Sequence, residues 1–193
     1  MPATAKAQPN IALIQYWGKR NSELNIPAVG SISITLADLH TTMGVSFDES
    51  LESDVLVVNG ASSDRMLPRV SRCLDAVAGS KRARAMVTSD SNFPIAAGLA
   101  SSASAFAALV VAADAAAGTG HDRERLASLA GQASGSAARS LFGGFVELKN
   151  VDEGIRVVQL SSAGDWPISV IIAITESGPK SVSSTVAMET SRE

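Results

Sequence analysis

The chain has 193 residues, of which 46% are hydrophobic and 18% are charged, and its formal net charge is −3 at pH 7. This composition is typical of a globular domain with a substantial core, and it excludes an intrinsically disordered chain. The acidic balance argues against a general nucleic-acid-binding surface, and no apolar run is long enough to span a bilayer. The single cysteine, Cys73, excludes an internal disulfide framework and indicates a reducing, cytoplasmic setting.

The first half of the chain is predicted to be rich in strands. Apolar runs and alternating patterns indicate strands, in chain order, at residues 10–17, 30–36, 41–47, 55–58 and 84–88. We expect the first strand to be buried, and the second and third to pair antiparallel. Residues 21–27 are typical of a loop or hairpin turn, and residues 64–78 have the apolar spacing of a helix, with Gly79 as its C-cap.

The second half begins with an Ala-rich helix, predicted from Leu99 to about Ala117 and stopped by Gly118. Asp122 is an expected N-cap for another helix, which runs to about Ala133. The remaining predicted elements are, in order, a turn into a short helix within 134–144, a strand at 145–148, its hairpin partner at 155–160, a buried strand at 168–174 and the start of a helix at 181–193. Strands and helices without regular alternation favour an α+β fold with antiparallel pairing.

A loop of small residues leads into the Ala-rich helix. Gly98 would let the backbone approach a ligand, and the hydroxyls of Ser101, Ser102 and Ser104 can donate to phosphate oxygens or help to hold a metal ion. The N–H groups at a helix start carry partial positive charge and bind anions, most often phosphate. The alternative interpretation is a core helix that serine caps in the ordinary way.

Two further polar segments, at residues 16–19 and 134–139, offer groups of the same kind. Lys19 follows two aromatic residues at a strand end, and Arg139 can hold a carboxylate or phosphate through two hydrogen bonds. Together with the loop they suit a ligand with many phosphate or carboxylate oxygens. The alternatives are a core aromatic pair beside a solvated lysine, helix-capping serines, and a surface ion pair of Arg139.

Other common sites do not match. His40 and His121 lie far apart in the sequence, and Gly131-Gln-Ala-Ser134-Gly135 is not a G-x-S-x-G elbow, which argues against a Ser-His-Asp hydrolase. The chain has no G-x-x-x-x-G-K-[ST] motif, so it is not a Walker-type NTPase. No paired metal-ligand spacing occurs, and no side chain is assigned as a metal ligand.

Four stretches, in this order along the chain, resemble those of a known family: Asn10-Ile-Ala-Leu-Ile-Gln-Tyr-Trp-Gly-Lys-Arg20, Asn92-Phe-Pro-Ile-Ala-Ala-Gly-Leu-Ala-Ser-Ser-Ala-Ser104, Ser134-Gly-Ser-Ala-Ala-Arg-Ser-Leu-Phe-Gly-Gly-Phe145 and Val182-Ser-Ser-Thr185. The second resembles the phosphate-binding motif of the GHMP kinase superfamily, and the set is similar to the mevalonate diphosphate decarboxylase family. The resemblance implies a GHMP-kinase N-terminal domain (ribosomal protein S5 domain 2-like) over residues 1–165 and the start of a C-terminal domain over 166–193.

The resemblance also implies a reaction. ATP phosphorylates the tertiary hydroxyl of mevalonate 5-diphosphate, and loss of phosphate and CO2 then gives isopentenyl diphosphate, with Mg²⁺ bridging the ATP phosphates. The implied catalytic residues are Arg139, which would hold the departing carboxylate, and Lys19. The implied ATP phosphate loop comprises Gly98, Ser101, Ser102 and Ser104, and the implied substrate-binding residues are Tyr16, Trp17, Gly18, Lys19, Ser134, Gly135, Ser136, Ala137, Ala138, Arg139 and Thr185.

Three departures from the family pattern bear on activity. Gln15 stands where many members have Lys, and Gly30 stands where the family often has Asn. The catalytic Asp of the family lies in an Asp-Ala-Gly-Pro-Asn-like motif, which this chain lacks; Asp152, Asp165 and Glu176 do not match it. We therefore expect a chain that is truncated relative to a complete fold, and inactive or nearly so by itself.

Two other functions remain open at this point. One is a kinase of the same superfamily that acts on mevalonate or its monophosphate, and the other is a non-catalytic remnant that binds a nucleotide. The expected partner is a small molecule, without nucleic acid or membrane, and a homodimer is one expected assembly.

Overall fold

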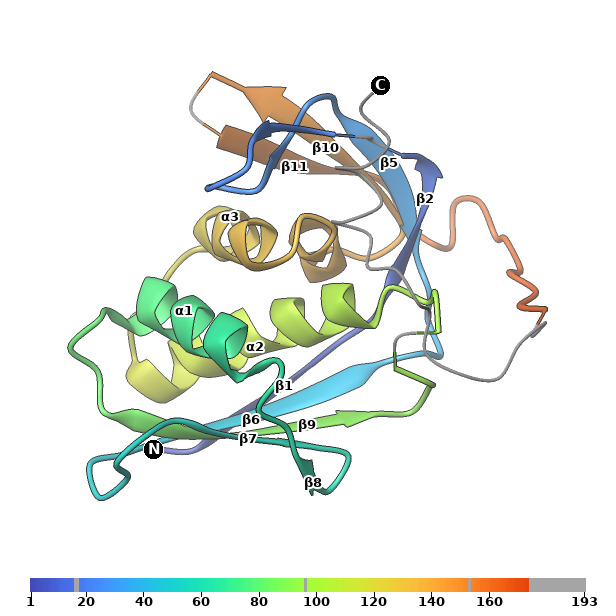
Figure 1. The fold of residues 1–193 in the computed structure, drawn as a ribbon. Coiled ribbons are helices and arrows are strands. Elements are labelled where there is room, and N and C mark those ends of the chain that lie inside the picture. Colours follow the sequence, from blue (N-terminus) through green and yellow to red (C-terminus); the bar gives the residue numbers. More distant parts are fainter. Residues whose placement is uncertain (16–17, 96, 153, 174–193) are drawn as a thin grey trace.

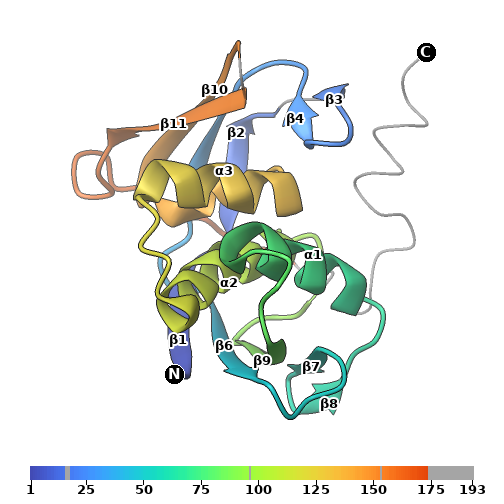
Figure 2. The same ribbon diagram turned by 90° about the vertical axis from the view of Figure 1, so that its left-hand side faces the viewer.

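The computed structural model describes residues 1–15, 18–95, 97–152 and 154–173, in which three helices lie between two sheets (Figures 1 and 2). One sheet has five strands in the order β1-β6-β9-β7-β8, and the other has four in the order β11-β10-β5-β2. Helices α1 and α2 are next to the first sheet, and α3 with a short 3-10 helix, η1, is next to the second. This arrangement is an α+β fold, as the sequence predicts.

The five-stranded sheet is antiparallel except where β7 and β9 pair in parallel. Its inward side chains, among them Met43, Val45, Leu56 and Val87, are almost completely buried under α1 and α2. Its strands are β1 (Ala3–Ala7), β6 (Thr41–Asp48), β7 (Val55–Val58), β8 (Ala61–Ser62) and β9 (Arg84–Ser91). Strands β1 and β8 were not predicted, because both are short and contain no large apolar residue.

The four-stranded sheet carries residues of the candidate site on the face toward α3 and η1. Its strands are β2 (Asn10–Ile14), β5 (Ser31–Thr35), β10 (Phe145–Val151) and β11 (Gly154–Ser161), all antiparallel. The predicted partner of 30–36 was wrong: β5 pairs with β2 and β10, whereas β6 belongs to the other sheet. A small hairpin of β3 (Lys19–Asn21) and β4 (Ile26–Pro27) confirms the turn predicted at 21–27.

The helices begin and end close to the predicted positions. They are α1 (Leu67–Ala78), α2 (Ser101–Ala117), α3 (Arg123–Ala133) and η1 (Ala137–Leu141). Gly79 and Gly118 end α1 and α2 with positive φ angles of 87° and 67°. The side chain of Asp122 accepts a hydrogen bond from the Arg125 N–H at 2.7 Å, so it caps α3.

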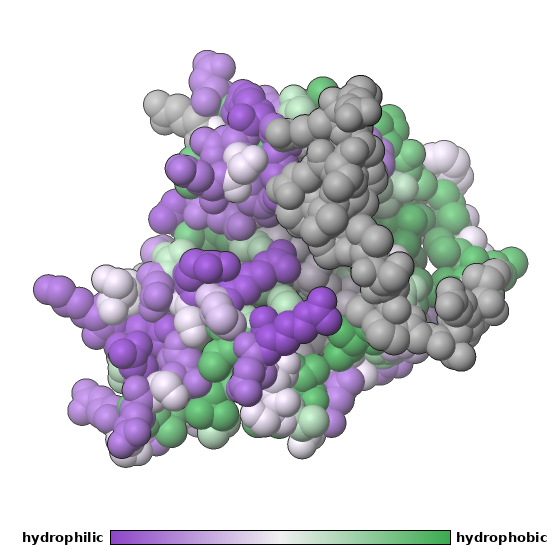
Figure 3. All heavy atoms as spheres, viewed as in Figure 1, coloured by the Kyte–Doolittle hydropathy of each residue, from purple (hydrophilic) through white to green (hydrophobic). Residues whose placement is uncertain are grey.

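Two predictions of burial were wrong. Strand β2 lies at the edge of its sheet, so Leu13 and Ile14 are 52% and 58% exposed. Residues 168–173 form no strand within the described part of the chain, because they have no partner strand there; Ile171 is 94% exposed. Just before this segment, Trp166 stacks on Phe145, with ring centroids 5.2 Å apart. Hydrophobic residues gather on this side of the molecule (Figure 3). The helix predicted from residue 181 lies outside the described residues.

Candidate ligand site at the start of helix α2

In the loop between β9 and α2, the backbone conformation is compatible with the predicted anion site. Gly98 has φ +87°, a conformation that side chains rarely adopt, and no atom lies within 4 Å of the place its Cβ would take. The N-cap of α2 is Ala100, with φ 51° and no side-chain capping hydrogen bond. Serine capping, the alternative explanation of this sequence, therefore does not account for the start of the helix. Ser101 is its first residue.

The three serines of the loop differ in their surroundings. Ser101 and Ser102 are half-buried at the start of α2. Ser104 is completely buried; its Oγ lies 2.7 Å from Thr41 Oγ1 and donates to the Ser101 carbonyl at 3.1 Å. The position of Ser104 anchors the helix start to strand β6, and a direct contact between Ser104 and phosphate remains a prediction.

A contact between two hydroxyls joins this loop to the predicted segment at residues 134–139. Ser134 Oγ donates to Ser102 Oγ at 3.2 Å, and Ser134 is 5% exposed. Ser134 is the C-cap of α3 in extended conformation, and its backbone N–H donates to the Ala130 carbonyl at 2.8 Å. The sequence 134–139 thus leaves α3 beside the start of α2 and continues into η1.

Arg139 is held inside the molecule by the four-stranded sheet. Only 1% of Arg139 is exposed, and it donates to Ser31 Oγ of β5 and, at 3.2 Å, to Asn10 Oδ1 of β2. Asn10 Nδ2 in turn donates to Ser140 Oγ at 2.7 Å and to the Ser136 carbonyl at 3.0 Å. The surface ion pair considered for Arg139 is excluded by this burial, because the guanidinium faces the sheet.

Asn10 and Ser31, which contact Arg139, were not predicted as site residues. Asn10 stands before an apolar run, so its position indicated only the start of a strand. Ser31 belongs to the polar half of an alternating strand, which is ordinarily assigned to solvent. The signal that could have found both is the position of an arginine in an otherwise small-residue segment, since a buried guanidinium requires several oxygen partners.

The predicted segment at residues 16–19 is described only from Gly18 on, so Tyr16 and Trp17 lie outside the described residues. Thr185, another predicted site residue, also lies outside them. Gly18 has φ +94° and its carbonyl accepts from the Ala28 N–H at 3.1 Å; Lys19 then begins β3. Gln15, one departure from the family pattern, is exposed beyond the end of β2. The hairpin that carries Lys19 reaches the 134–139 region through Asn25, whose Nδ2 donates to the Gly131 carbonyl at 2.9 Å.

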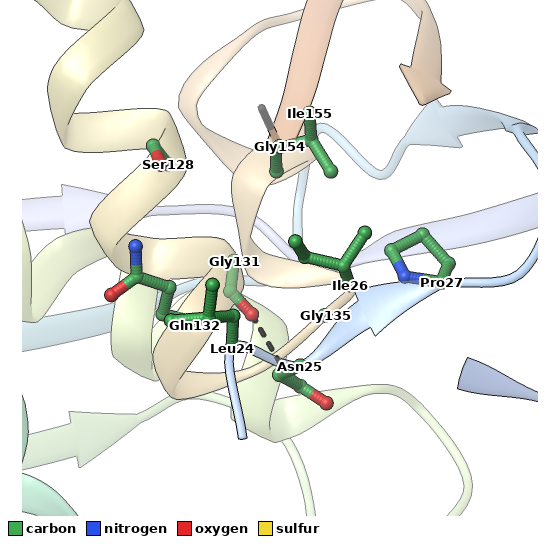
Figure 4. Close-up of a pocket in the computed structure, with 10 residues that line it drawn as sticks. All are labelled: Leu24, Asn25, Ile26, Pro27, Ser128, Gly131, Gln132, Gly135, Gly154 and Ile155. Carbon is green, nitrogen blue, oxygen red and sulfur yellow. Dashed lines mark hydrogen bonds between the residues drawn. The ribbon is translucent and has the colours of Figure 1, made fainter. Parts of the chain in front are cut away.

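Residues of this hairpin, the end of α3 and the start of β11 line a small cavity that includes Gly135 (Figure 4). Its volume of about 40 Å³ is far below that of a nucleotide pocket, which is on the order of 300 Å³ or more.

Three acidic residues, Asp54, Asp152 and Asp165, lie in turns or ion pairs outside the candidate site. Asp165 accepts hydrogen bonds from Ser162 and Ser161, which lower the pKa of its carboxyl, so it stabilises a turn. Asp152 is exposed in the turn between β10 and β11. Asp54 is paired with Arg82 at the end of β9 opposite the loop. Within the described ranges, no group of three or more His, Cys, Asp or Glu could hold a metal ion.

The two-sheet fold, with a glycine-containing loop that opens a buried helix beside a buried arginine, is that of a GHMP-type N-terminal domain. The family model for the diphosphomevalonate decarboxylase-like N-terminal domain matches residues 7–159. The chain belongs to this diphosphomevalonate decarboxylase-like family.

Known relatives agree with this assignment. The diphosphomevalonate decarboxylase of Candida albicans is 38% identical over 97% of this chain and 57% of its own. The solved mevalonate diphosphate decarboxylase of Staphylococcus aureus is 41% identical, with a TM-score of 0.75 over 83% of this chain and 51% of its own. MDDEF, solved in complex with MVAPP, AMPPCP and magnesium, is 36% identical, with a TM-score of 0.84 over 97% of this chain and 59% of its own. The chain therefore spans about half the length of the relatives it matches.

In the described residues, no helix has both the length and the apolarity to cross a membrane.

Proposed function

We propose that these residues form the half of a diphosphomevalonate decarboxylase that binds the ATP phosphates and part of mevalonate 5-diphosphate. The observation that carries this proposal is the 3.2 Å contact between Ser102 and Ser134, which joins the phosphate loop to the segment containing Arg139. A phosphate donor and an acceptor hydroxyl must meet for transfer to occur, and two anion-binding segments in contact provide that proximity.

The chain's own groups suit the charges of both ligands. The backbone at the start of α2 and the hydroxyls of Ser101 and Ser102 would bind phosphate oxygens. Arg139 would hold the substrate carboxylate, and its contacts with Ser31 and Asn10 fix the plane of the guanidinium. Lys19, from the hairpin, would neutralise part of the diphosphate charge. The reaction would convert a poorly leaving tertiary hydroxyl into a phosphate, which leaves as CO2 is lost.

Magnesium fits this site only with help from the nucleotide. Mg²⁺ is commonly bound through one or two carboxylates together with substrate phosphates and waters. Since the described residues offer hydroxyls here without an acidic cluster, the phosphate oxygens themselves would supply most ligands of the ion. When bound, the ion would offset charge that develops on the phosphates.

The catalytic Asp implied by the family resemblance has no counterpart in the 193 residues, and the positions of Asp152 and Asp165 in turns offer no substitute. We therefore propose that these 193 residues bind both ligands but turn them over slowly or not at all.

A single-turnover assay with ATP and mevalonate 5-diphosphate tests the proposal, with ADP and CO2 measured together and binding followed by titration calorimetry. We expect saturable binding of both ligands and little product. CO2 at ordinary rates would contradict the proposed inactivity, ADP without CO2 would favour a kinase, and nucleotide binding that does not respond to mevalonate 5-diphosphate would favour a remnant.

We further propose a cytoplasmic setting, since an ATP-dependent reaction and a single buried thiol fit a reducing compartment. A homodimer remains a prediction that sedimentation can test.

A further inference from the structure

The hairpin of β3 and β4, which carries Lys19, is tied to the end of β10. Arg20 Nη2 donates to the Val151 carbonyl at 2.9 Å. Asn150 Nδ2 donates to the Pro27 carbonyl at 2.8 Å, so each strand of the hairpin has one such attachment. Both lie along the strands of the hairpin and neither holds its tip.

Among the hydrogen bonds of the described residues, that of Asn25 connects the tip of the hairpin to α3. Asn25 has φ 54°, a left-handed conformation that Asn tolerates better than most residues. Its Nδ2 donates to the Gly131 carbonyl at 2.9 Å (Figure 4). Because a carbonyl oxygen can only accept, the nitrogen and not the oxygen of this amide must face Gly131.

The hydrogen bond from Asn25 supplies a donor for a carbonyl in the last turn of α3. The final carbonyls of a helix have no partner within the helix. Here the Ser134 N–H donates to Ala130, Arg69 Nε of α1 donates to Ala133 at 2.7 Å, and Asn25 donates to Gly131 between them. The hairpin is thus attached to the helical turn from which the chain passes directly to Ser134.

Packing beneath the tip is incomplete. The cavity of about 40 Å³ lies between the hairpin and the end of α3, with Leu24, Ile26 and Gln132 among its lining residues. Side chains therefore leave part of the space under Asn25 unfilled, and the hydrogen bond to Gly131 is a directional contact at this place.

We propose that Asn25 is a positioning residue: its hydrogen bond to Gly131 sets the place of the hairpin, and with it Lys19, relative to the segment that contains Ser134 and Arg139. The inference rests on the proposed function, in which Lys19 and that segment bind one substrate. Asn25 acts through the hairpin and makes no contact with the substrate.

The first experiment needs no ligand and uses hydrogen exchange of the Ala28 amide, which donates to Gly18 across the hairpin. Asn25→Asp keeps the shape and the backbone preference but places an acceptor against an acceptor. Asn59→Asp is the matched control: Asn59 also has a left-handed φ, 48°, but uses its Oδ1 to accept from Ser91 N–H, which Asp retains. We expect exchange of the Ala28 amide to rise about tenfold in Asn25→Asp and to stay constant in Asn59→Asp. Unchanged exchange in Asn25→Asp would overturn the proposal.

The second experiment measures the Kd for mevalonate 5-diphosphate in the unsubstituted chain, in Asn25→Gly, in Lys19→Met and in the double variant. Asn25→Gly permits the same φ without adding a charge. We expect about tenfold weaker binding from Asn25→Gly alone and no further loss once Lys19 is replaced. Fully additive losses would overturn the proposal, because Asn25 would then not act through Lys19. Absence of binding by the unsubstituted chain would instead contradict the proposed function, and the exchange experiment would still decide the role of Asn25.

Discussion

Ser102 and Ser134 are 32 residues apart in the sequence, yet their hydroxyl oxygens lie 3.2 Å from one another. One belongs to the first turn of α2 and the other ends α3. The contact is therefore the point at which the loop between β9 and α2 meets the segment leading to Arg139.

The first prediction concerns this pair. Replacing either serine by alanine is expected to weaken binding of a non-hydrolysable ATP analogue by about 1 kcal/mol, since each removes a hydroxyl donor. The double variant should lose less than the sum, with a coupling of about 0.5 kcal/mol or more, because the hydroxyls contact each other. Calorimetric Kd values for the four chains complete the cycle. Strict additivity would show that the two serines serve the ligand independently.

Arg139→Met is expected to affect both stability and binding. The thermal midpoint should fall, because the buried Asn10 Oδ1 and Ser31 Oγ each lose a hydrogen-bond donor. Binding of mevalonate 5-diphosphate should weaken by about 2 kcal/mol, roughly thirtyfold in Kd, through loss of charged hydrogen bonds. A folded variant that still binds with unchanged Kd would remove Arg139 from the site.

Acid sensitivity should come largely from Asp54. Burial alone would raise the pKa of its carboxyl, but hydrogen bonds from Arg82, Ser71 and the Ala85 N–H, with the charge of Arg82, hold that pKa well below its usual value. A pKa that is lower in the folded state means stability that is present above about pH 4 and lost as the pH falls.

Asp54→Asn should therefore lower the free energy of unfolding by about 3 kcal/mol at neutral pH and flatten its decline toward acid. Asp75→Asn is the control: Asp75 also pairs with Arg82, at 2.9 Å, but its side chain is 43% exposed. Its loss should cost about 1 kcal/mol or less. Urea unfolding at pH 3 to 7 checks both, and parallel profiles for Asp54→Asn and the unsubstituted chain would contradict the assignment.

Gly30, a departure from the family pattern, has a structural reason here. A Cβ at this position would lie 2.8 Å from the Leu148 carbonyl oxygen, so the strands β5 and β10 would have to shift. Gly30→Asn is expected to lower the free energy of unfolding by about 1–3 kcal/mol. Gly164→Asn, where the nearest atom is Ser162 Oγ at 3.8 Å, should be almost neutral in the same urea titration. Equal stability of the two variants would show that β10 adjusts freely.

Local chemistry explains which elements the sequence could predict. Gly79, Gly118 and Asp122 end or begin helices through backbone conformations and caps that depend only on near neighbours. The choice of partner for a strand depends on distant residues, so the pairing of residues 30–36 with 41–47 was wrong although both are strands. Burial of Leu13 and Ile14 was overestimated for the same reason, because an apolar strand at a sheet edge has the same composition as a central one.

In the candidate site, too, local features could be predicted and contacts between distant residues could not. The loop with Gly98 and the N-terminus of α2 could be predicted, because its geometry follows from adjacent residues. The contact of Ser102 with Ser134, and the support of Arg139 by Asn10, join positions far apart and required the fold. The domain boundary at residue 165 remains a prediction.

Helix α2 is buried on almost every side, and alanines such as Ala107, Ala108 and Ala112 let β1, β6 and α1 come close to its axis. A rigid rod held this tightly transmits displacement along its length. Enlarging one of these methyl groups would push the helix away from the sheet and displace the loop at its start. A substitution deep in the helix would then alter the proposed ligand site without contacting a ligand.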